Sequence, residues 1–525
     1  MTAATVPAAA RRVPLTGPAR LLRLELRRNP MLWMLPLLAA LFWLGVYRPA
    51  LANPPFWNVR ATALQHALLF LGPLLAGVTA WAGSRDGRRG LTDLVGVTAV
   101  PRWTGQLASW AAATCWAEAV YLGGVAVVYG ITAEQARWGG PLWWPVAVGA
   151  AGVATCCALG FAAGALLPGR FTAALAAVVV FLALGGGAFA MQNNNTYAQI
   201  WPLDVQGPFP TDSYGIFYPY VPDLAIAQVM FLAGIAVAAL GALGQTARAG
   251  GRGLRVAAAA VTVAGLAAAG TAVGLAGTAR LEAHGIVIPA LHDAASDRPV
   301  PYTPVCSHAA VPVCLQPAYR GFLPAVSAAV SPTLGALAGL PGAPVRVTQV
   351  AVTSVVQGTG NSVGLGGPVV VGRPPVLFLP LAGLPLPGEP GTTATQFTST
   401  LRMQVGPPVL NDLVGLSNSA GLQPGGGPGA VFGQSATSPR TAAQRAVAAA
   451  LAQDAGLLPA LRPASGPRPS GKWQVWPGRG AYLARGQQAA VAVRFAALPA
   501  AVRHAWLAAH LGPLRAGRVT LSEIP

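Results

Sequence analysis

Seven apolar stretches, each near the length that crosses a bilayer, constrain this chain more than any other feature. A helix needs about 20 mostly apolar residues to cross the hydrocarbon core. With 54% hydrophobic and 9% charged residues, the chain also lies outside the range of ordinary soluble domains. The sequence therefore predicts a polytopic α-helical membrane protein with about seven transmembrane helices. The stretches are residues 31–47, 64–83, 105–130, 142–166, 171–191, 224–244 and 256–277.

The arginines give this bundle an orientation, because basic loops stay on the cytoplasmic side of a membrane. Residues 1–30 are polar, basic and too long for a usual signal peptide, so we expect a cytoplasmic N-terminus and a retained first span. With that start, only Arg48, Arg60 and Arg137 fall in external loops between spans, and residues 280–525 lie outside the cell membrane. The net charge of +19 does not indicate nucleic-acid binding, because the arginines flank apolar spans and no recognition module accompanies them.

A charged connector, GSRDGRRGLTDLVGVTAVPRWTGQ, joins the second and third stretches on the expected cytoplasmic face. Leu91, Leu94 and Val95 recur at helical spacing, and Pro101 ends the pattern. This indicates a short amphipathic helix within 84–102 that lies parallel to the membrane. Its charged residues are Arg85, Asp86, Arg88, Arg89 and Asp93.

Two further segments have interfacial character. ARLLRLELRRNP alternates leucines with charges before the first span, and Pro30 ends it, which is typical of an elbow helix at the membrane surface. Between the fifth and sixth stretches, residues 192–223 are dense in tyrosine, phenylalanine and tryptophan. That density suits an aromatic belt or a re-entrant segment at the external surface.

Together these features resemble the permease subunits of ABC transporters of the type 2 exporter class. The resemblance covers about residues 15–247 and rests on the elbow helix, the charged helix between spans two and three, and the long aromatic segment between spans five and six. In that family the second feature is the coupling helix, which docks in a cleft of an ATPase subunit. The resemblance implies a six-span core over 31–247 and a homodimer or a heterodimer with a related permease. Residues 248–279, with a cytoplasmic loop and a seventh span, and the domain at 280–525 depart from the family pattern.

Docking on an ATPase gives the connector charges a physical reason, since a helix that transmits motion is held by packing and charge pairs. The candidates for this role are Arg85, Asp86, Arg88, Arg89 and Asp93. The alternative is that the arginines only enforce topology, as in any cytoplasmic loop. Topology does not require Asp86, Asp93 or the apolar stripe, which favours coupling.

A motor within this chain is not indicated. The segment GPRPSGKW falls one residue short of a phosphate-binding loop, and Trp473 stands where a hydroxyl would bind magnesium. Pro467 and Pro469 also remove backbone donors. We therefore expect no intrinsic enzyme activity and no cofactor, with ATP hydrolysis in a separate subunit.

Glu118 lies near the middle of the third stretch, where an ionisable side chain is costly and often functional. It could line a cargo path or couple to protons. The other reading is a protonated carboxyl group that bonds to a neighbouring helix. Both stay open, and the cargo itself is not indicated.

Residues 280–525 combine strand-like apolar runs with helical segments, which predicts an α+β external domain. Cys306 and Cys314 are expected to pair in an oxidising compartment, the alternative being two free thiols. A metal site with His308 lacks a fourth ligand. His504 and His510 are not at the spacing of a helical metal pair. The domain is expected to cap or dock at the outer mouth; the alternative for the whole protein is a membrane-anchored external sensor or scaffold without transport activity.

Overall fold

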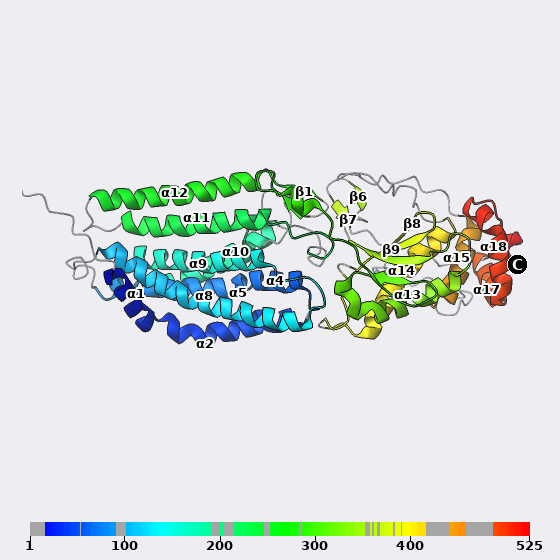
Figure 1. Ribbon diagram of the computed structural model, residues 1–525, viewed down its shortest axis with the longest axis horizontal. Helices are drawn as coiled ribbons and strands as arrows, with labels where there is room; N and C mark the ends of the chain where they lie inside the picture. Colours follow the sequence, from blue (N-terminus) through cyan, green and yellow to red (C-terminus); the bar gives the residue numbers. More distant parts are fainter. Residues whose placement is uncertain are drawn as a thin grey trace, which may run out of the picture.

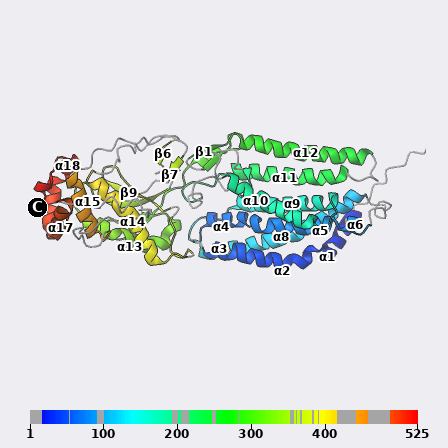
Figure 2. The same ribbon diagram turned by 180° about the vertical axis from the view of Figure 1, so that it is seen from behind.

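A computed structural model of the protein shows an elongated molecule with a helical bundle at one end and a sheet-containing domain at the other (Figure 1). Figure 2 shows the same two parts from behind. The described residues are 16–52, 54–90, 101–191, 200–203, 215–245, 252–282, 285–351, 357–359, 362–364, 368–381, 384–389, 391–415, 441–457 and 487–525.

The bundle is built from long apolar helices that run roughly parallel (Figure 1). The first is α2, which continues through a π-helical turn, η1, into α3. The helices are α1 (Thr16–Arg28), α2 (Met31–Phe42), η1 (Trp43–Tyr47), α3 (Arg48–Ala52), α4 (Trp57–His66), α5 (Leu68–Gly83), α6 (Arg85–Arg88), α8 (Arg102–Gln135), α9 (Trp143–Leu166), α10 (Thr172–Met191), α11 (Asp223–Gln245) and α12 (Arg252–Ala276).

Six helical segments among the described residues are long and apolar enough to cross a membrane. They are Met31–Ala52, Trp57–Gly83, Arg102–Gln135, Trp143–Leu166, Asp223–Gln245 and Arg252–Ala276. The fifth predicted span coincides with α10, whose apolar part, Thr172–Gly186, is shorter than these six. Six segments that could span a membrane are therefore a property of the fold, and the seventh stays a prediction.

The second span begins earlier than the sequence suggested, and Arg60 lies inside it instead of in an external loop. Its guanidinium is buried and donates to Thr132 Oγ1 at 3.0 Å and to Gln135 Oε1 at 2.6 Å, near the end of α8. These acceptors, close to the negative end of a helix, compensate the buried charge. Arginine therefore does not mark a loop at this position.

Glycine allows the closest helix contacts in the bundle. Any side chain at Gly160 or Gly164 of α9 would overlap the backbone of α5 at Ala76 and Ala80. On the other side, Gly234 of α11 faces the backbone of α12, where a Cβ atom would lie 2.7 Å from the Gly265 carbonyl oxygen. Small residues thus let spans pack backbone to backbone, as is common in membranes.

The sheet domain contains a mixed five-stranded sheet with the order β3-β4-β5-β9-β8. The three central strands are parallel, and each edge strand is antiparallel to its neighbour. Helix α13 (Leu323–Leu337) makes the crossover between β4 and β5, which the α+β prediction did not include. The strands are β3 (Val305–Cys306), β4 (Val313–Leu315), β5 (Arg346–Val350), β8 (Val369–Val371) and β9 (Val376–Pro380).

Helices pack on this sheet and extend the domain to the C-terminus. The core of the domain includes three fully buried strand residues, Val347 of β5 and Leu377 and Leu379 of β9. The helices are α14 (Ala394–Leu413), α15 (Ala442–Asp454), α17 (Gln487–Ala497) and α18 (Ala500–Arg515). Short elements complete it: β1 (Arg280–Glu282), β2 (Gly285–Val287), β6 (Gln357–Thr359), β7 (Ser362–Gly364), η4 (Ala294–Asp297), η5 (Pro317–Phe322) and η7 (Leu521–Glu523).

Candidate functional site

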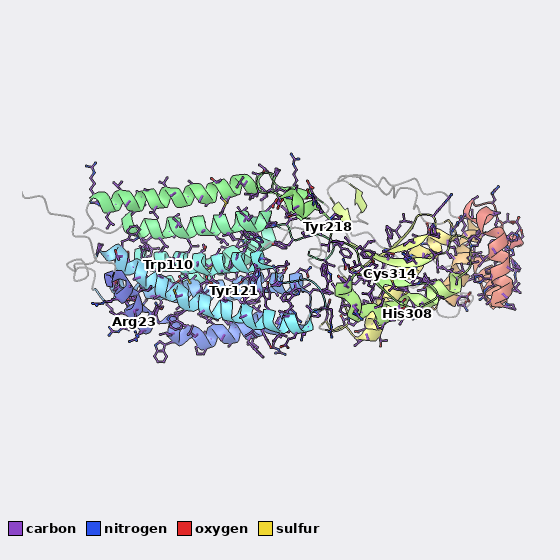
Figure 3. The ribbon with its side chains drawn as sticks, in the orientation of Figure 1. Arg23, Trp110, Tyr121, Tyr218, His308 and Cys314 are labelled. Atoms are coloured by element: carbon purple, nitrogen blue, oxygen red, sulfur yellow. A yellow bond between two sulfur atoms is a disulfide. The ribbon has the colours of Figure 1, made fainter. Side chains whose placement is uncertain are left out.

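Four of the candidate coupling residues, Arg85, Asp86, Arg88 and Arg89, lie at the end of the bundle farthest from the sheet domain, which we call the polar end. Helices α1 and α6 lie there (Figure 2). Figure 3 labels Arg23 at this end and Cys314 and His308 in the sheet domain. The bundle therefore separates these four residues from the sheet domain along its whole length.

The turn between α1 and α2 is fixed to α8. Asn29 is buried; its Oδ1 accepts the Met31 amide at 3.0 Å, and its Nδ2 donates to the Ser109 carbonyl at 3.3 Å. In addition, Trp116 Nε1 donates to the Leu26 carbonyl at 2.9 Å. The predicted elbow helix is thus anchored to the helix that follows the connector.

Arg85 joins the connector to the elbow helix. Its Nη2 lies 3.5 Å from Glu25 Oε1 on α1, and its Nε lies 3.5 Å from Asp86 Oδ1. Because Arg85 is about a third exposed, each pair contributes little stability, at most about 1 kcal/mol. The structure therefore places Arg85 and Asp86 in contacts within the chain, where they position α6.

The side chains of Arg88 and Arg89, at the end of α6, have different surroundings. Arg88 lies over the Trp81 ring, 4.9 Å from its centroid, and donates to the Trp81 carbonyl at 3.0 Å. Arg89 is exposed. Between them and Arg85, Gly87 faces Pro168 so closely that a Cβ atom would lie 2.5 Å from the proline ring. The turn between α9 and α10 therefore supports α6.

The rest of the predicted coupling helix lies outside the described residues. Asp93 and the stripe of Leu91, Leu94 and Val95 fall in this part. Within 84–102 the structure describes residues 84–90, which include α6, and residues 101–102, where α8 begins at Arg102 directly after Pro101.

Glu118 is half-buried on α8, and its Oε2 is buried without a hydrogen-bond partner among the described residues. The nearby Tyr121 hydroxyl instead lies 3.4 Å from the Leu64 carbonyl and 3.3 Å from the Val146 carbonyl. An unsatisfied oxygen inside a bundle calls for a water, a proton or a ligand. Among the described residues this oxygen makes no hydrogen bond to a neighbouring helix.

The sheet domain is joined to the bundle through the loop between α3 and α4. Phe56, from this loop, belongs to the core of the sheet domain, with its ring centroid 4.7 Å from Tyr319 and 6.1 Å from Phe322. Ile216, which precedes α11, enters the same core, and its carbonyl accepts from Gln316 Nε2 at 3.1 Å. The domain is thus held by two bundle loops in addition to its covalent link through α12.

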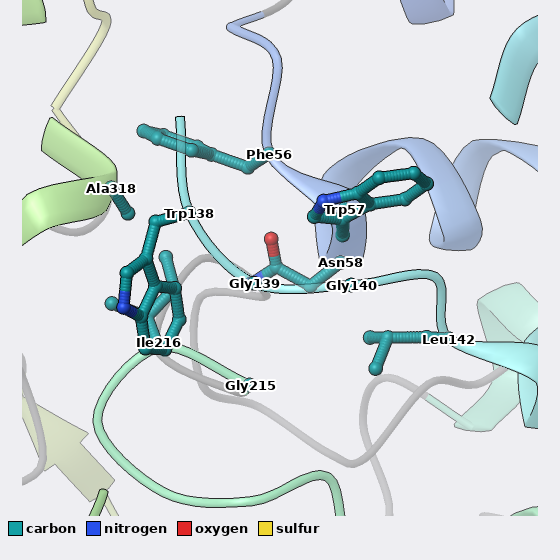
Figure 4. A pocket seen from close by; sticks show the side chains of 10 residues that line it. All are labelled: Phe56, Trp57, Asn58, Trp138, Gly139, Gly140, Leu142, Gly215, Ile216 and Ala318. Atoms are coloured by element: carbon teal, nitrogen blue, oxygen red, sulfur yellow. The ribbon is translucent and has the colours of Figure 1, made fainter. Parts of the chain in front are cut away.

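A small cavity of about 20 Å³ remains at this junction. Trp57, Trp138 and Leu142 border it together with Phe56 and Ile216 (Figure 4). The volume suits a single water molecule. The junction is therefore a closely packed joint.

Asp223, at the start of α11, makes a second joint. It is fully buried; its Oδ2 accepts the Ile288 amide at 2.9 Å and lies 3.1 Å from His292 Nδ1. His292 Nε2 lies 2.9 Å from Asp297 Oδ1. Burial lowers the pKa of His292, but the bonds to Asp297 and Asp223 outweigh it, so the pKa lies above its ordinary value.

Cys306 and Cys314 are directly opposite each other on β3 and β4 and form a disulfide. The sequence analysis singled out this pair but missed Phe56, Asp223 and His292. Of these, only Asp223 had a usable signal, since an acidic residue in the first turn of a span suits the positive end of the helix.

Searches against protein-family models, curated proteins and solved structures found no match to this chain. Function is therefore inferred from the chemistry of its own residues.

Proposed function

We propose that this protein is the membrane-spanning permease subunit of an ATP-driven exporter, similar in its working parts to the type 2 ABC class. Seven helices form its embedded unit in the cell membrane, with the N-terminus in the cytoplasm and the sheet domain outside. A separate ATPase chain supplies the work. A second copy or a related permease completes the path.

The observation that supports coupling most is the anchoring of α6. Arg85 links α6 to α1 through Glu25, and Gly87 packs on Pro168 in the turn between α9 and α10. A partner that moves the 84–102 segment would therefore act on several helices together, because rigid packed elements carry such motion. A loop that only enforced topology would need none of these contacts.

Arg89 and Asp93 are the charges that we assign to docking. Arg85, Asp86 and Arg88 are engaged within the chain. Arg89 is exposed at the end of α6, and Asp93 follows in the same segment. Charge pairs at the rim of an interface fix its register and partner choice.

The test is copurification from native membranes in mild detergent. Tagged wild type should bring down a nucleotide-binding chain and ATPase activity, and the double reversal Arg89→Glu with Asp93→Lys should lose both. Arg255→Glu, a reversal on α12 at the same end, should keep both. Size-exclusion profiles of all three proteins establish that each is folded and inserted.

The competing function is a membrane-anchored sensor or scaffold whose external domain does the work. The packed joint at Phe56 and Ile216 favours it, since it presents the sheet domain rigidly. If no ATPase accompanies the wild type even after crosslinking, the transport proposal fails and the scaffold is preferred.

A further inference from the structure

Two arginine–aromatic pairs lie near each other at the polar end. Arg88 covers the ring of Trp81 at 4.9 Å, and Arg170 covers the ring of Phe171 at 4.6 Å. Both rings are exposed, Trp81 by 48% and Phe171 by 67%. We call these four residues the arginine–aromatic surface.

The two pairs come from segments that pack on each other. Gly77 of α5 lies against α10, where its Cβ atom would be 3.3 Å from the Ala173 oxygen and from Ala177 Cβ. Gly87, next to Arg88, contacts Pro168, two residues before Arg170. The pairs therefore belong to one side of the bundle, where α5 and α10 run together.

This surface has no acidic counterpart in the described part of the polar end. The carboxylates described there are Glu25 and Asp86, and Arg85 contacts both. Arg88 gives one Nη2 N–H to the Trp81 carbonyl, a bond that together with the ring holds the guanidinium in place. A guanidinium has five N–H groups, so a stacked arginine can still present its other edge to phosphate oxygens. The surface thus favours a phosphate-bearing anion.

Apolar side chains continue from the arginines along the turn and α10. Leu167 is 64% exposed and Leu175 is 59% exposed. An acidic protein would pair with the arginines but would leave these leucines uncovered or bury them at an edge. A phospholipid satisfies both, because its phosphate meets the cations and its acyl chains cover the leucines.

We propose that the arginine–aromatic surface binds the phosphodiester headgroup of an anionic phospholipid of the surrounding leaflet, with the acyl chains along Leu167 and Leu175. Arg88 and Arg170 hold the phosphate, and Trp81 and Phe171 orient the two guanidinium groups. This assignment does not depend on the transport function, since it needs neither an ATPase nor a cargo.

The test compares lipids that stay on the purified full-length protein. After delipidation in detergent, dioleoyl phosphatidylglycerol or dioleoyl phosphatidylcholine is added, and bound lipids are counted by native mass spectrometry. Wild type should retain phosphatidylglycerol preferentially. Arg88→Gln with Arg170→Gln should weaken that retention on the order of tenfold or more.

The matched control is Arg252→Gln with Arg255→Gln, which removes the same charge from exposed arginines on α12 at the same end. It should keep the preference for phosphatidylglycerol. If the double variant is poorly folded, Arg170→Gln alone gives the same comparison with a smaller loss. Equal retention of the two lipids by wild type would overturn the proposal. An equal loss of phosphatidylglycerol in the control variant would also overturn it, because the preference would then come from the overall positive charge of this end.

Discussion

His292 lies between two carboxylates, with Nδ1 3.1 Å from Asp223 Oδ2 and Nε2 2.9 Å from Asp297 Oδ1. A neutral imidazole donates through one nitrogen only, whereas the imidazolium donates through both. The arrangement therefore suits a charged histidine. It fixes the segment after α12 to the first turn of α11, at the root of the sheet domain.

This relationship predicts a pH dependence of stability. The pKa of His292 is raised in the folded protein, since the two carboxylate bonds outweigh burial, so its contribution is complete below the ordinary histidine value of about 6.5. The contribution is lost as the pH rises through the folded pKa. We expect the melting temperature of the purified protein to fall as the pH rises from about 6.5 through the raised pKa of His292. The variant His292→Gln should lack this decrease in melting temperature.

The control is His308→Gln, because His308 is exposed on the same domain. This variant should keep the wild-type pH profile. A pH profile for His292→Gln that parallels wild type throughout would show that the contacts of His292 with Asp223 and Asp297 do not contribute to stability.

The packing of Phe56 predicts that this ring contributes much of the contact between the bundle and the core of the sheet domain. Phe56→Ala removes a buried side chain from the domain core, a change that costs about 3 kcal/mol or more. Hydrogen exchange should rise in η5, whose Tyr319 and Phe322 pack on the ring, and in α13, which follows η5 directly. Phe181→Ala, on an exposed position of α10, should leave exchange in the domain unchanged. Unchanged exchange in Phe56→Ala would mean that the domain holds its position without this contact.

Properties that depend on local composition could be predicted from the sequence. The apolar lengths located the helices, and the two cysteines eight residues apart lie on neighbouring strands. The burial of Arg60 could not be foreseen, because its acceptors Thr132 and Gln135 are more than 70 residues away. When those partners are not known, an arginine beside an apolar stretch is interpreted as a loop residue.

The contacts that join the bundle to the sheet domain could not be predicted from the sequence for the same reason. Phe56 looks like any aromatic residue near a membrane surface, and its partners Tyr319 and Phe322 lie in another part of the chain. Asp223 and His292 are 69 positions apart. Only the fold brings such pairs together, since each residue alone fits several environments.

The disulfide offers a test of the proposed external location of the sheet domain. Cys306 is exposed, Cys156 and Cys157 are buried in the bundle, and Cys115 is exposed on α8, so Cys115→Ser serves as the background. After mild reduction of intact cells, a membrane-impermeant maleimide should label this background protein but not the same protein with Cys306→Ser and Cys314→Ser. Labelling that requires cell lysis would place the domain on the cytoplasmic side and contradict the proposed orientation.

The close contact between α5 and α9 at Gly164 predicts that a larger residue there destabilises the bundle. A Cβ atom there would overlap the Ala80 carbonyl, so Gly164→Ala must separate the two helices or shift one along the other. Overpacking of this kind typically costs about 1–3 kcal/mol of stability.

Gly130→Ala on α8 is the matched control, because no described residue beyond its own helical turn lies within 4 Å of the added methyl group. Since alanine is the better helix former, the control should melt at or slightly above the wild-type temperature in the same detergent. Gly164→Ala should melt several degrees lower. Equal melting of the two variants would mean that the spans tolerate a wider separation than the backbone contact at Ala80 implies.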